Sequence, residues 1–313
     1  MIEIKNLVKH YGDIEAVNGI SFTVKDNEIL GFLGPNGAGK STTMNIITGY
    51  LSSTSGSVKI DGHDILEEPE LAKKKIGYLP EQPPLYNDMT VGEYLKFICE
   101  LKGVPKKDHK EHIEMITSMV GISAVTGRLI GNLSKGYKQR VGIAQALVGD
   151  PHTLILDEPT VGLDPNQIIG IRKLIKQLSK NHSIIVSSHI LSEIQEIADR
   201  VVIINRGRIA AIDTILELSQ RLSGENKLLL SFKGPAKDVV ARLKMIPGIA
   251  DAAVRNSGEV SSVEISLAPK AGNDVRTNIF FMMAKSGWPI LEFRSLDPSL
   301  EEVFLSVTTG KGV

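Results

Sequence analysis

Residues 34–41 read Gly-Pro-Asn-Gly-Ala-Gly-Lys-Ser, and this stretch and its flanks indicate how the chain folds. An apolar run, Ile-Leu-Gly-Phe-Leu, precedes it at 29–33, and Thr-Thr-Met-Asn-Ile-Ile follows at 42–47 with the character of a helix. Strand, glycine loop and helix in that order predict a phosphate-binding P-loop. The glycines let successive backbone N–H groups turn inward, and the positive end of the helix dipole points at the same place.

The expected phosphate contacts come from this loop and the turn after it: Gly34, Pro35, Asn36, Gly37, Ala38, Gly39, Lys40, Ser41 and Thr42. Lys40 is expected to reach the β- and γ-phosphates of a nucleotide, and Ser41 to offer its hydroxyl to Mg²⁺. The alternative is a glycine-rich turn without a ligand. The lysine, the hydroxyl and both flanks argue against that alternative.

Composition and charge narrow the class of protein. With 313 residues, of which 42% are hydrophobic, the chain is long enough for about two domains with buried cores. Its 36 basic and 36 acidic side chains cancel, so charge gives no argument for nucleic acid, and none is expected as a partner. The single cysteine, Cys99, excludes an internal disulfide and fits a reducing cytosol. Neither a signal peptide nor a run near the ~18 apolar residues of a membrane span is expected, so another chain must cross the membrane if this protein acts there.

Short apolar strands recur along the first part of the chain, at 28–33, 76–79, 153–156 and 183–186. Each precedes a loop and a helical pattern, which predicts an α/β fold with a parallel sheet and helices on both faces. One of these helices is well marked, because Asp164 can cap it and Pro165 suits its first position.

Residues from about 88 to 150 show a different pattern. Three helices are expected there, starting near Thr90, near Pro105 and near Leu133, and no strand is expected. Thr90 and Glu93 form a possible capping box for the first of them. A helical subdomain inserted into the α/β core is the simplest account.

The pattern changes again at 222–226, Leu-Ser-Gly-Glu-Asn, which predicts a linker. Beyond it the expected elements are a strand (227–232), a helix (235–245), two strands (249–254 and 260–267), a helix (273–286), a strand (289–293) and a helix (298–307). This order predicts a small ferredoxin-like α+β domain over 227–313, after a nucleotide-binding domain over 1–220.

Two acids end an apolar strand downstream of the P-loop, in Leu-Ile-Leu-Asp-Glu at 154–158. Asp157 is expected to hold the Mg²⁺ shell, and Glu158 to polarise the attacking water. The alternative, a strand that merely ends at an acidic helix start, is weakened by the P-loop upstream.

A second anion site is expected in Leu-Ser-Lys-Gly-Tyr-Lys-Gln-Arg at 133–140, with Ser134 and Gly136 at a helix N-terminus. One γ-phosphate does not need two such sites from one subunit. Here the chain resembles the nucleotide-binding subunits of ABC transporters, whose signature reads Leu-Ser-Gly-Gly-Gln. In that family the signature of one subunit closes over ATP held by the P-loop of the other. The resemblance covers residues 1 to about 220 and implies a P-loop NTPase core with a mixed sheet.

Further positions match that family. Tyr11 matches the aromatic residue that stacks on adenine, with a buried strand tyrosine as the alternative. Asp164, in Gly-Leu-Asp at 162–164, matches the loop that communicates across the dimer. His189 matches the switch histidine, which implies contacts to the γ-phosphate and to Glu158. The other six histidines form no metal pattern in the sequence, and among them His109 and His112 are expected to be exposed to solvent.

Two places depart from the family pattern. Glu81 stands where the family usually has the glutamine that meets Mg²⁺ and the attacking water. It is expected to keep both the metal and the catalytic role, with added negative charge near the phosphates. The signature carries Lys135 and Tyr137 where glycine and glutamine are usual. Ser134 and Gly136 remain, and Lys135 adds charge attraction.

The resemblance implies ATP and Mg²⁺ as ligands, hydrolysis by in-line attack of water, and a head-to-tail pair with a second copy or a related ATP-binding subunit. One nucleotide domain followed by an α+β domain is similar to the type-two exporter class, which includes drug, antibiotic, sodium-efflux and gliding-motility exporters. That class implies a separate multi-span membrane permease, contacted at 83–90, and a peripheral location on the cytoplasmic face of the plasma (inner) membrane. The motif at 296–304 is similar to the ending of that class.

Other interpretations stay open beside this one. A soluble ABC ATPase of translation or DNA repair usually has two nucleotide domains, or a long coiled coil, and basic surfaces. A P-loop kinase would need an acceptor site and has no use for a signature loop. A non-catalytic regulatory subunit would not need both Lys40 and Glu158. The segment at 83–90 is alternatively an ordinary proline-rich surface loop.

Overall fold

The computed structural model describes residues 1–222, 227–268 and 274–295, with only the backbone described at 219–222. These residues form two compact units that divide between Ile215 and Leu216. The first unit contains every candidate site residue. Most of the predicted linker, the predicted helix at 298–307 and the motif at 296–304 lie outside the described residues.

A six-stranded sheet lies at the centre of the first unit, in the order β10-β9-β3-β8-β7-β6. Its strands are β3 (Ile29–Leu33), β6 (Ile76–Leu79), β7 (Thr153–Asp157), β8 (Ser183–Ser188), β9 (Arg200–Asn205) and β10 (Arg208–Thr214). β10 is antiparallel to β9, and the other neighbouring pairs are parallel. β3, β7 and β8 are buried along their whole length, as strands covered on both faces should be. The four strands predicted from apolar runs are confirmed.

A second sheet, antiparallel and in the order β2-β1-β4-β5, was not predicted. Its strands are β1 (Ile2–Tyr11), β2 (Ile14–Val24), β4 (Ser55–Ile60) and β5 (His63–Asp64). Its apolar side chains, such as Leu7 and Ile20, share a core with Phe32 of β3 and Met44 of helix α1 (Lys40–Ile47). The expectation of helices on both faces of the central sheet is therefore wrong for one face, which this sheet and α1 cover together. Register shifts interrupt the β1–β2 pairing and blur the period of two that reveals a strand.

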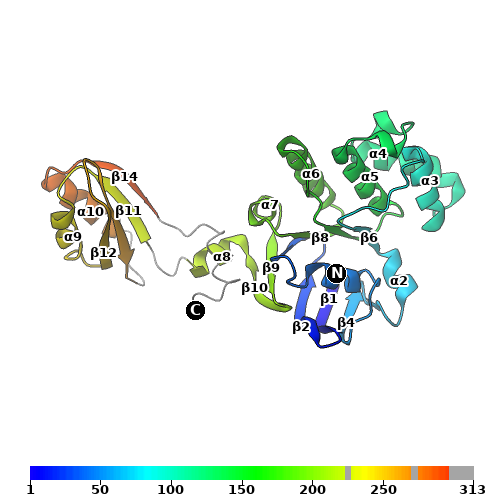
Figure 1. The fold of residues 1–313 in the computed structure, drawn as a ribbon, viewed down its shortest axis with the longest axis horizontal. Coiled ribbons are helices and arrows are strands. Elements are labelled where there is room, and N and C mark those ends of the chain that lie inside the picture. Colours follow the sequence, from blue (N-terminus) through cyan, green and yellow to red (C-terminus); the bar gives the residue numbers. More distant parts are fainter. Residues whose placement is uncertain (223–226, 269–273, 296–313) are drawn as a thin grey trace. The chain divides into compact units, whose positions relative to one another are not determined.

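Helices occupy the region from 88 to 150, as expected, and Figure 1 shows three of them gathered beyond β6. They are α3 (Val91–Leu101), α4 (His109–Met119) and α5 (Lys135–Leu147). The predicted capping box is present, since the Glu93 amide donates to Thr90 Oγ1 and the Thr90 amide to the Glu93 carboxylate. A methyl group on Gly77 of β6 would collide with the Ala146 carbonyl of α5, so this helix approaches the core as closely as only glycine allows. The inserted helical subdomain is confirmed.

Four further α-helices lie outside residues 88–150 and before the second unit's first strand: α2 (Pro69–Lys74), α6 (Pro165–Leu178), α7 (Leu191–Gln195) and α8 (Ile215–Leu222). Asp164 caps α6 as predicted, because its carboxylate accepts the amide of Gln167 at 3.0 Å. None of the described helices is long and apolar enough to cross a bilayer.

The expectation for the histidines of α4 is wrong at His109. Its side chain is buried, and Nε2 lies 2.8 Å from the Val104 carbonyl, which ties the start of α4 to the preceding loop. His112 is half-buried, and its Nε2 accepts the amide of Gly149. Both rings satisfy backbone groups that would otherwise lack partners.

The second unit has the predicted ferredoxin-like order. Its elements are β11 (Lys227–Phe232), α9 (Ala236–Leu243), β12 (Ile249–Asn256), β13 (Ser261–Leu267), α10 (Asp274–Lys285) and β14 (Ile290–Ser295). The strands form an antiparallel sheet in the order β12-β13-β11-β14. Apolar side chains from alternate positions of β11 pack with Val239 of α9 and Ile279 of α10. The β-α-β-β-α-β order and this sheet confirm the α+β prediction.

Candidate nucleotide site

A cavity of about 320 Å³ opens where the loop after β3 meets the carboxyl ends of the neighbouring parallel strands. Its lining residues come from five separate stretches of the chain: Ala16, Asn36, Gly37, Gly39, Lys40, Ser41, Thr42, Glu81, Glu158, Val161 and His189. The structure therefore brings most of the predicted P-loop residues together with the three predicted catalytic residues.

The backbone of the P-loop has the conformation that the glycines were expected to allow. Gly37 and Gly39 have φ angles of 78° and 105°, in the region that favours glycine. A methyl group on Gly34 would lie 2.5 Å from the Ile204 carbonyl of β9, so the loop begins in close contact with the sheet. Gly34, Pro35 and Ala38 do not line the cavity; they support the loop from behind, with Ala38 donating its amide to the Pro35 carbonyl.

Lys40 lies within the cavity wall with only 6% of its surface exposed. Its Nζ donates to the Gly34 carbonyl at 2.8 Å and lies 3.6 Å from Oε1 of Glu158. A buried ammonium keeps a strong attraction for an anion, because little water screens its charge. Lys40 therefore supplies the positive charge that a polyphosphate needs at this position.

The carboxylate of Glu158 lies between the side chains of His189 and Lys40. Nδ1 of His189 lies 2.9 Å from its Oε2, and the ammonium of Lys40 lies on the Oε1 side. The backbone of Glu158 has a φ of 48°, which is rare outside glycine and is found most often at functional sites. The backbone amide of Glu158 donates to Ser187 Oγ at 3.0 Å, which fixes the backbone at this position. The carboxylate is thus held at the mouth of the cavity.

Asp157 lies deeper, with 3% of its surface exposed, and Ser187 Oγ donates to its carboxylate. Burial raises the pKa of Asp157, and the neighbouring charges of Glu158 and Glu81 raise it further, against the hydrogen bond from Ser187. Three carboxylates therefore gather near the ammonium of Lys40. The oxygens of Asp157, Glu81 and Ser41 are the hard donors that Mg²⁺ prefers, so the donor set fits that ion.

Residues 17–161 match the family model described as ABC transporter. The bacitracin transport ATP-binding protein BcrA of Bacillus licheniformis is 34% identical over 99% of this chain and 98% of its own length. The linearmycin resistance ATP-binding protein LnrL of Bacillus subtilis is 32% identical over 98% of both chains. The chain belongs to the ATP-binding subunits of ABC transporters.

A solved structure of a dimeric cassette is also similar to this chain. A dimeric ATP-binding cassette in a post-hydrolysis state, bound to ADP and Pi, matches with a TM-score of 0.62 and 25% identity, over 69% of this chain and 99% of that one. This ABC subunit is an ATP hydrolase, as its motifs predicted. Nothing in these comparisons supports the alternative role in translation or DNA repair.

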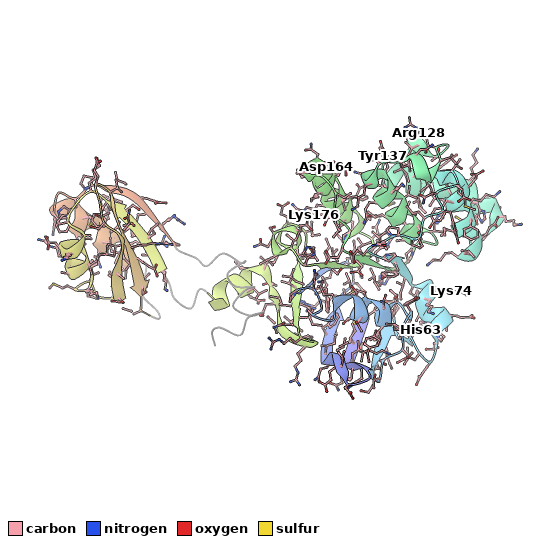
Figure 2. All side chains as sticks on the ribbon, in the orientation of Figure 1. His63, Lys74, Arg128, Tyr137, Asp164 and Lys176 are labelled. Atoms are coloured by element: carbon pink, nitrogen blue, oxygen red, sulfur yellow. The ribbon has the colours of Figure 1, made fainter. Side chains whose placement is uncertain are left out.

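The signature residues of this ABC subunit lie outside the nucleotide cavity. Ser134 caps α5, and with Gly136 and Tyr137 it lines a separate pocket of about 200 Å³. A methyl group on Gly136 would lie 2.6 Å from the side chain of Gln167, so α5 and α6 begin in contact. Figure 2 labels Tyr137 and Asp164 at the starts of these two helices.

Tyr11 is also absent from the cavity lining. It ends β1 with 46% of its surface exposed, so the alternative of a buried strand tyrosine is wrong. The ammonium of Lys9 lies 5.3 Å from the centre of its ring. The exposed ring is available for stacking.

Sequence reasoning missed several supporting residues. Ser187 bonds both Asp157 and Glu158, and Val161 and Ala16 line the cavity. Glu193 is buried and accepts from Thr160 Oγ1. Only Ser187 carried a signal, because it stands two residues before His189; the others have no motif of their own.

One group of possible metal ligands was not expected from the sequence. Atoms of Asp26, Asp61 and His152 lie within 4.8 Å of one another. The amino group of Met1 donates to both carboxylates, at 2.7 and 2.6 Å, so a cation of the chain itself already balances them. His152 precedes β7, whereas Asp157 ends that strand, which separates this group from the nucleotide cavity.

Proposed function

We propose that ATP binds in the cavity around Lys40 and that its hydrolysis drives a separate membrane permease in an export system. The observation that carries this proposal is the meeting of the P-loop, Glu81, Glu158 and His189 around one cavity. The full-length match to transport and resistance ATP-binding proteins supports the transport role.

The residues of the cavity have different roles in ATP hydrolysis. The amides of the P-loop and the ammonium of Lys40 hold the β- and γ-phosphates. Glu158 orients and polarises the water that attacks in line, and His189 holds the Glu158 carboxylate in place and reaches the γ-phosphate. Because the phosphoryl group needs little covalent help, most of the acceleration comes from positioning and charge.

Mg²⁺ belongs to this proposal through Ser41, Glu81 and Asp157. When bound, the ion neutralises charge on the phosphates. Glu81 adds a carboxylate where related chains have an amide, which strengthens the hold on a divalent cation and raises the negative charge beside the phosphates.

The signature completes the site from a second protomer. Ser134, Gly136 and Asp164 lie at the starts of α5 and α6 and do not line the chain's own cavity. A head-to-tail pair would place them over ATP held by the partner, while Tyr11 stacks on the adenine within its own protomer. The partner is a second copy or a related ATP-binding subunit.

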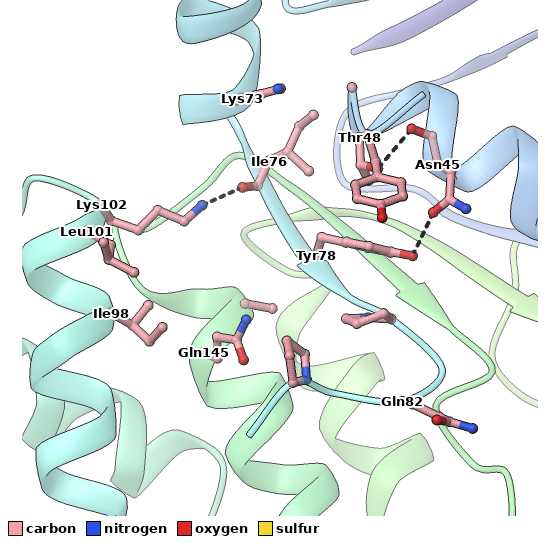
Figure 3. Close-up of a pocket in the computed structure, with 15 residues that line it drawn as sticks. Asn45, Thr48, Lys73, Ile76, Tyr78, Gln82, Ile98, Leu101, Lys102 and Gln145 are labelled. Carbon is pink, nitrogen blue, oxygen red and sulfur yellow. Dashed lines mark hydrogen bonds between the residues drawn. The ribbon is translucent and has the colours of Figure 1, made fainter. Parts of the chain in front are cut away.

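A larger groove is proposed to receive the permease. It has a volume of about 680 Å³ and lies between α1 and β6 on one side and α3 and α5 on the other. Figure 3 shows Tyr78 bonded to Asn45 on the first wall and Lys102 bonded to the Ile76 carbonyl across the groove. The groove contains Pro84 of the predicted contact segment.

The rim of this groove is apolar and exposed. Tyr50 is 79% exposed and Leu101 67% exposed, which is costly unless a partner covers them. Burial also raises the pKa of Tyr78 to about 12, so its hydroxyl stays neutral as a donor in the groove. We assign this surface to a short apolar segment of the permease. The subunit then lies peripherally on the cytoplasmic face of the membrane.

Residues 1–220 act in this scheme as the nucleotide-binding domain and 227–313 as an accessory domain. The division between Ile215 and Leu216 lies close to that boundary and supports it.

The hydrolysis proposal is tested by phosphate release from ATP with and without chelation of Mg²⁺. We expect release that needs Mg²⁺ and disappears in Glu158→Gln. Release that persists at full rate in that variant would contradict the assignment of Glu158.

The docking proposal is tested with Leu101→Glu, which places a charge on the groove rim. We expect co-purification with the membrane permease to be lost while phosphate release by the isolated subunit is kept. Leu66→Glu is the matched control, since Leu66 is 50% exposed and does not line the groove. Equal loss in both variants would argue against the groove.

A further inference from the structure

A buried carboxylate that does not line the nucleotide cavity contacts two of the segments that form it. Glu193 is 8% exposed and lies in the short helix α7, which follows β8. Its Oε2 accepts hydrogen bonds from two hydroxyl groups, those of Thr160 and Ser188, the second at 3.4 Å. One carboxylate oxygen therefore connects two loops that are distant in the chain.

Both hydroxyl groups belong to residues that stand beside the catalytic residues of the nucleotide site. Thr160 lies two residues after Glu158, in a turn that the Val161 amide closes by donating to the Glu158 carbonyl at 3.2 Å. Ser188 ends β8 directly before His189. Both hydroxyl-bearing side chains are buried, so little water competes for these bonds. A shift of either one would change the contact between His189 and the Glu158 carboxylate, now 2.9 Å.

The carboxylate is held by a rigid element. The next residue, Ile194, packs closely on β3, because a methyl group on Gly31 would lie 2.2 Å from its Cγ2. The direction of one bond is also fixed: Ser188 Oγ accepts the Ile190 amide at 3.0 Å, so its own proton is free for Glu193. Groups on packed helices and strands are positioned more precisely than groups on loops.

The charge at this buried place has a cost. Burying a carboxylate is unfavourable unless donors satisfy it, and an apolar side chain of similar size would avoid that cost. In return, a hydrogen bond to an ionised acceptor is stronger than one between neutral groups. We propose that Glu193 is a positioning residue for ATP hydrolysis, which holds the loop of Glu158 and the loop of His189 in register. This inference rests on the proposed function, because it acts through the roles given there to these two residues.

The test measures kcat and KM for phosphate release from ATP by the full chain. Glu193→Met keeps the length of the side chain and removes both oxygens. We expect kcat to fall roughly 10-fold and KM to change less than about 2-fold, because the catalytic groups are displaced while the P-loop still binds ATP. Glu193→Gln keeps an oxygen that accepts from Thr160 and should recover most of the loss. Parental kcat in Glu193→Met, with only the free energy of unfolding lowered, would overturn the proposal.

Thr160 tests the same connection from its other end, and this arm decides the matter if Glu193→Met does not fold. Thr160→Val keeps the branched shape of the side chain and removes its hydroxyl, whereas Thr160→Ser keeps the hydroxyl. We expect the first variant to lose kcat and the second to retain it. Equal kcat in the two variants would contradict a role for the bond to Glu193.

Glu196→Gln is the matched control. Glu196 caps the end of the same helix, its side chain is 64% exposed, and its carboxylate pairs with Arg172 at 2.7 Å. Its kcat should match the parent. The same loss as in Glu193→Met would show a general effect of charge at α7 and overturn the proposal.

The Glu158→Gln background separates this inference from the proposed function. Because Glu193 acts through Glu158, adding Glu193→Met there should lower the residual rate of phosphate release less than about 2-fold. A loss as large as in the parent chain would overturn the inference, since it shows an independent role. If Glu158→Gln alone leaves the rate unchanged, the proposed function itself fails, and the inference falls with it.

Discussion

The nucleotide cavity and the signature pocket are both proposed to contact phosphate, and they differ in how many charged groups one protomer gathers at each. The cavity gathers buried charges from several strands, with Lys40 6% exposed and Glu158 in a rare backbone conformation. The signature pocket is smaller, about 200 against 320 Å³, and the charged residue of its lining, Arg140, already donates to the Val120 carbonyl. The difference teaches that contacts within one chain fix the charged groups of the nucleotide cavity, whereas the signature pocket gathers no comparable set of charges.

The largest effect is expected from a substitution at Glu158 in the nucleotide cavity. Glu158→Gln removes the group that polarises water, and we expect the rate of phosphate release to fall roughly 10³-fold. ATP should still bind, so gel filtration with ATP should show a stable dimer. A variant that stays monomeric with ATP would mean that the cavity and the signature do not cooperate.

Lys40→Ala tests the cavity alone. Removing the point charge from the P-loop should raise the dissociation constant for ATP by about 100-fold, measured by equilibrium binding to single protomers. The signature is untouched, so this loss should not depend on protein concentration. Binding close to that of the unmodified chain would contradict the P-loop assignment.

Ser134→Ala tests the signature alone. We expect phosphate release to fall roughly 10-fold at saturating ATP, because one neutral donor to the γ-phosphate is lost. Binding of ATP to single protomers should not change, which separates this variant from Lys40→Ala. Weaker binding to single protomers would show that Ser134 acts within its own chain.

Ser187→Ala has the smallest expected effect, and it tests how much the hydroxyl of Ser187 stabilises the cavity. Loss of the hydroxyl leaves the Glu158 amide and the Asp157 carboxylate without their shared partner, at a cost of about 1–3 kcal/mol in the free energy of unfolding. Denaturant unfolding measures this cost. Ser179→Ala is the control, since its hydroxyl bonds only a carbonyl one turn earlier in α6.

Local signals explain which parts of the fold were predicted correctly. β3, β7 and β8 are continuous apolar runs, and α3 begins with a capping box, so a few adjacent residues were enough to identify them. The antiparallel sheet was missed because bulges interrupt its alternation. The exposure predicted for His109 failed because its acceptor, the Val104 carbonyl, has no signature in sequence.

The sequence by itself determined the chemistry of this protein. A triphosphate and a water were predicted as reactants from short motifs: the P-loop at Gly34 to Ser41, the acids Asp157 and Glu158, and the signature. Each of these motifs can be read from the sequence because its function depends on adjacent residues. Only the tertiary structure decided how these motifs divide in space. The strand ends bring Glu81, Glu158 and His189 to the P-loop, while the contact between α5 and α6 holds Ser134 in another pocket. The physical reason is that sheet order and helix packing arise from contacts between residues far apart in the chain, which no local pattern encodes.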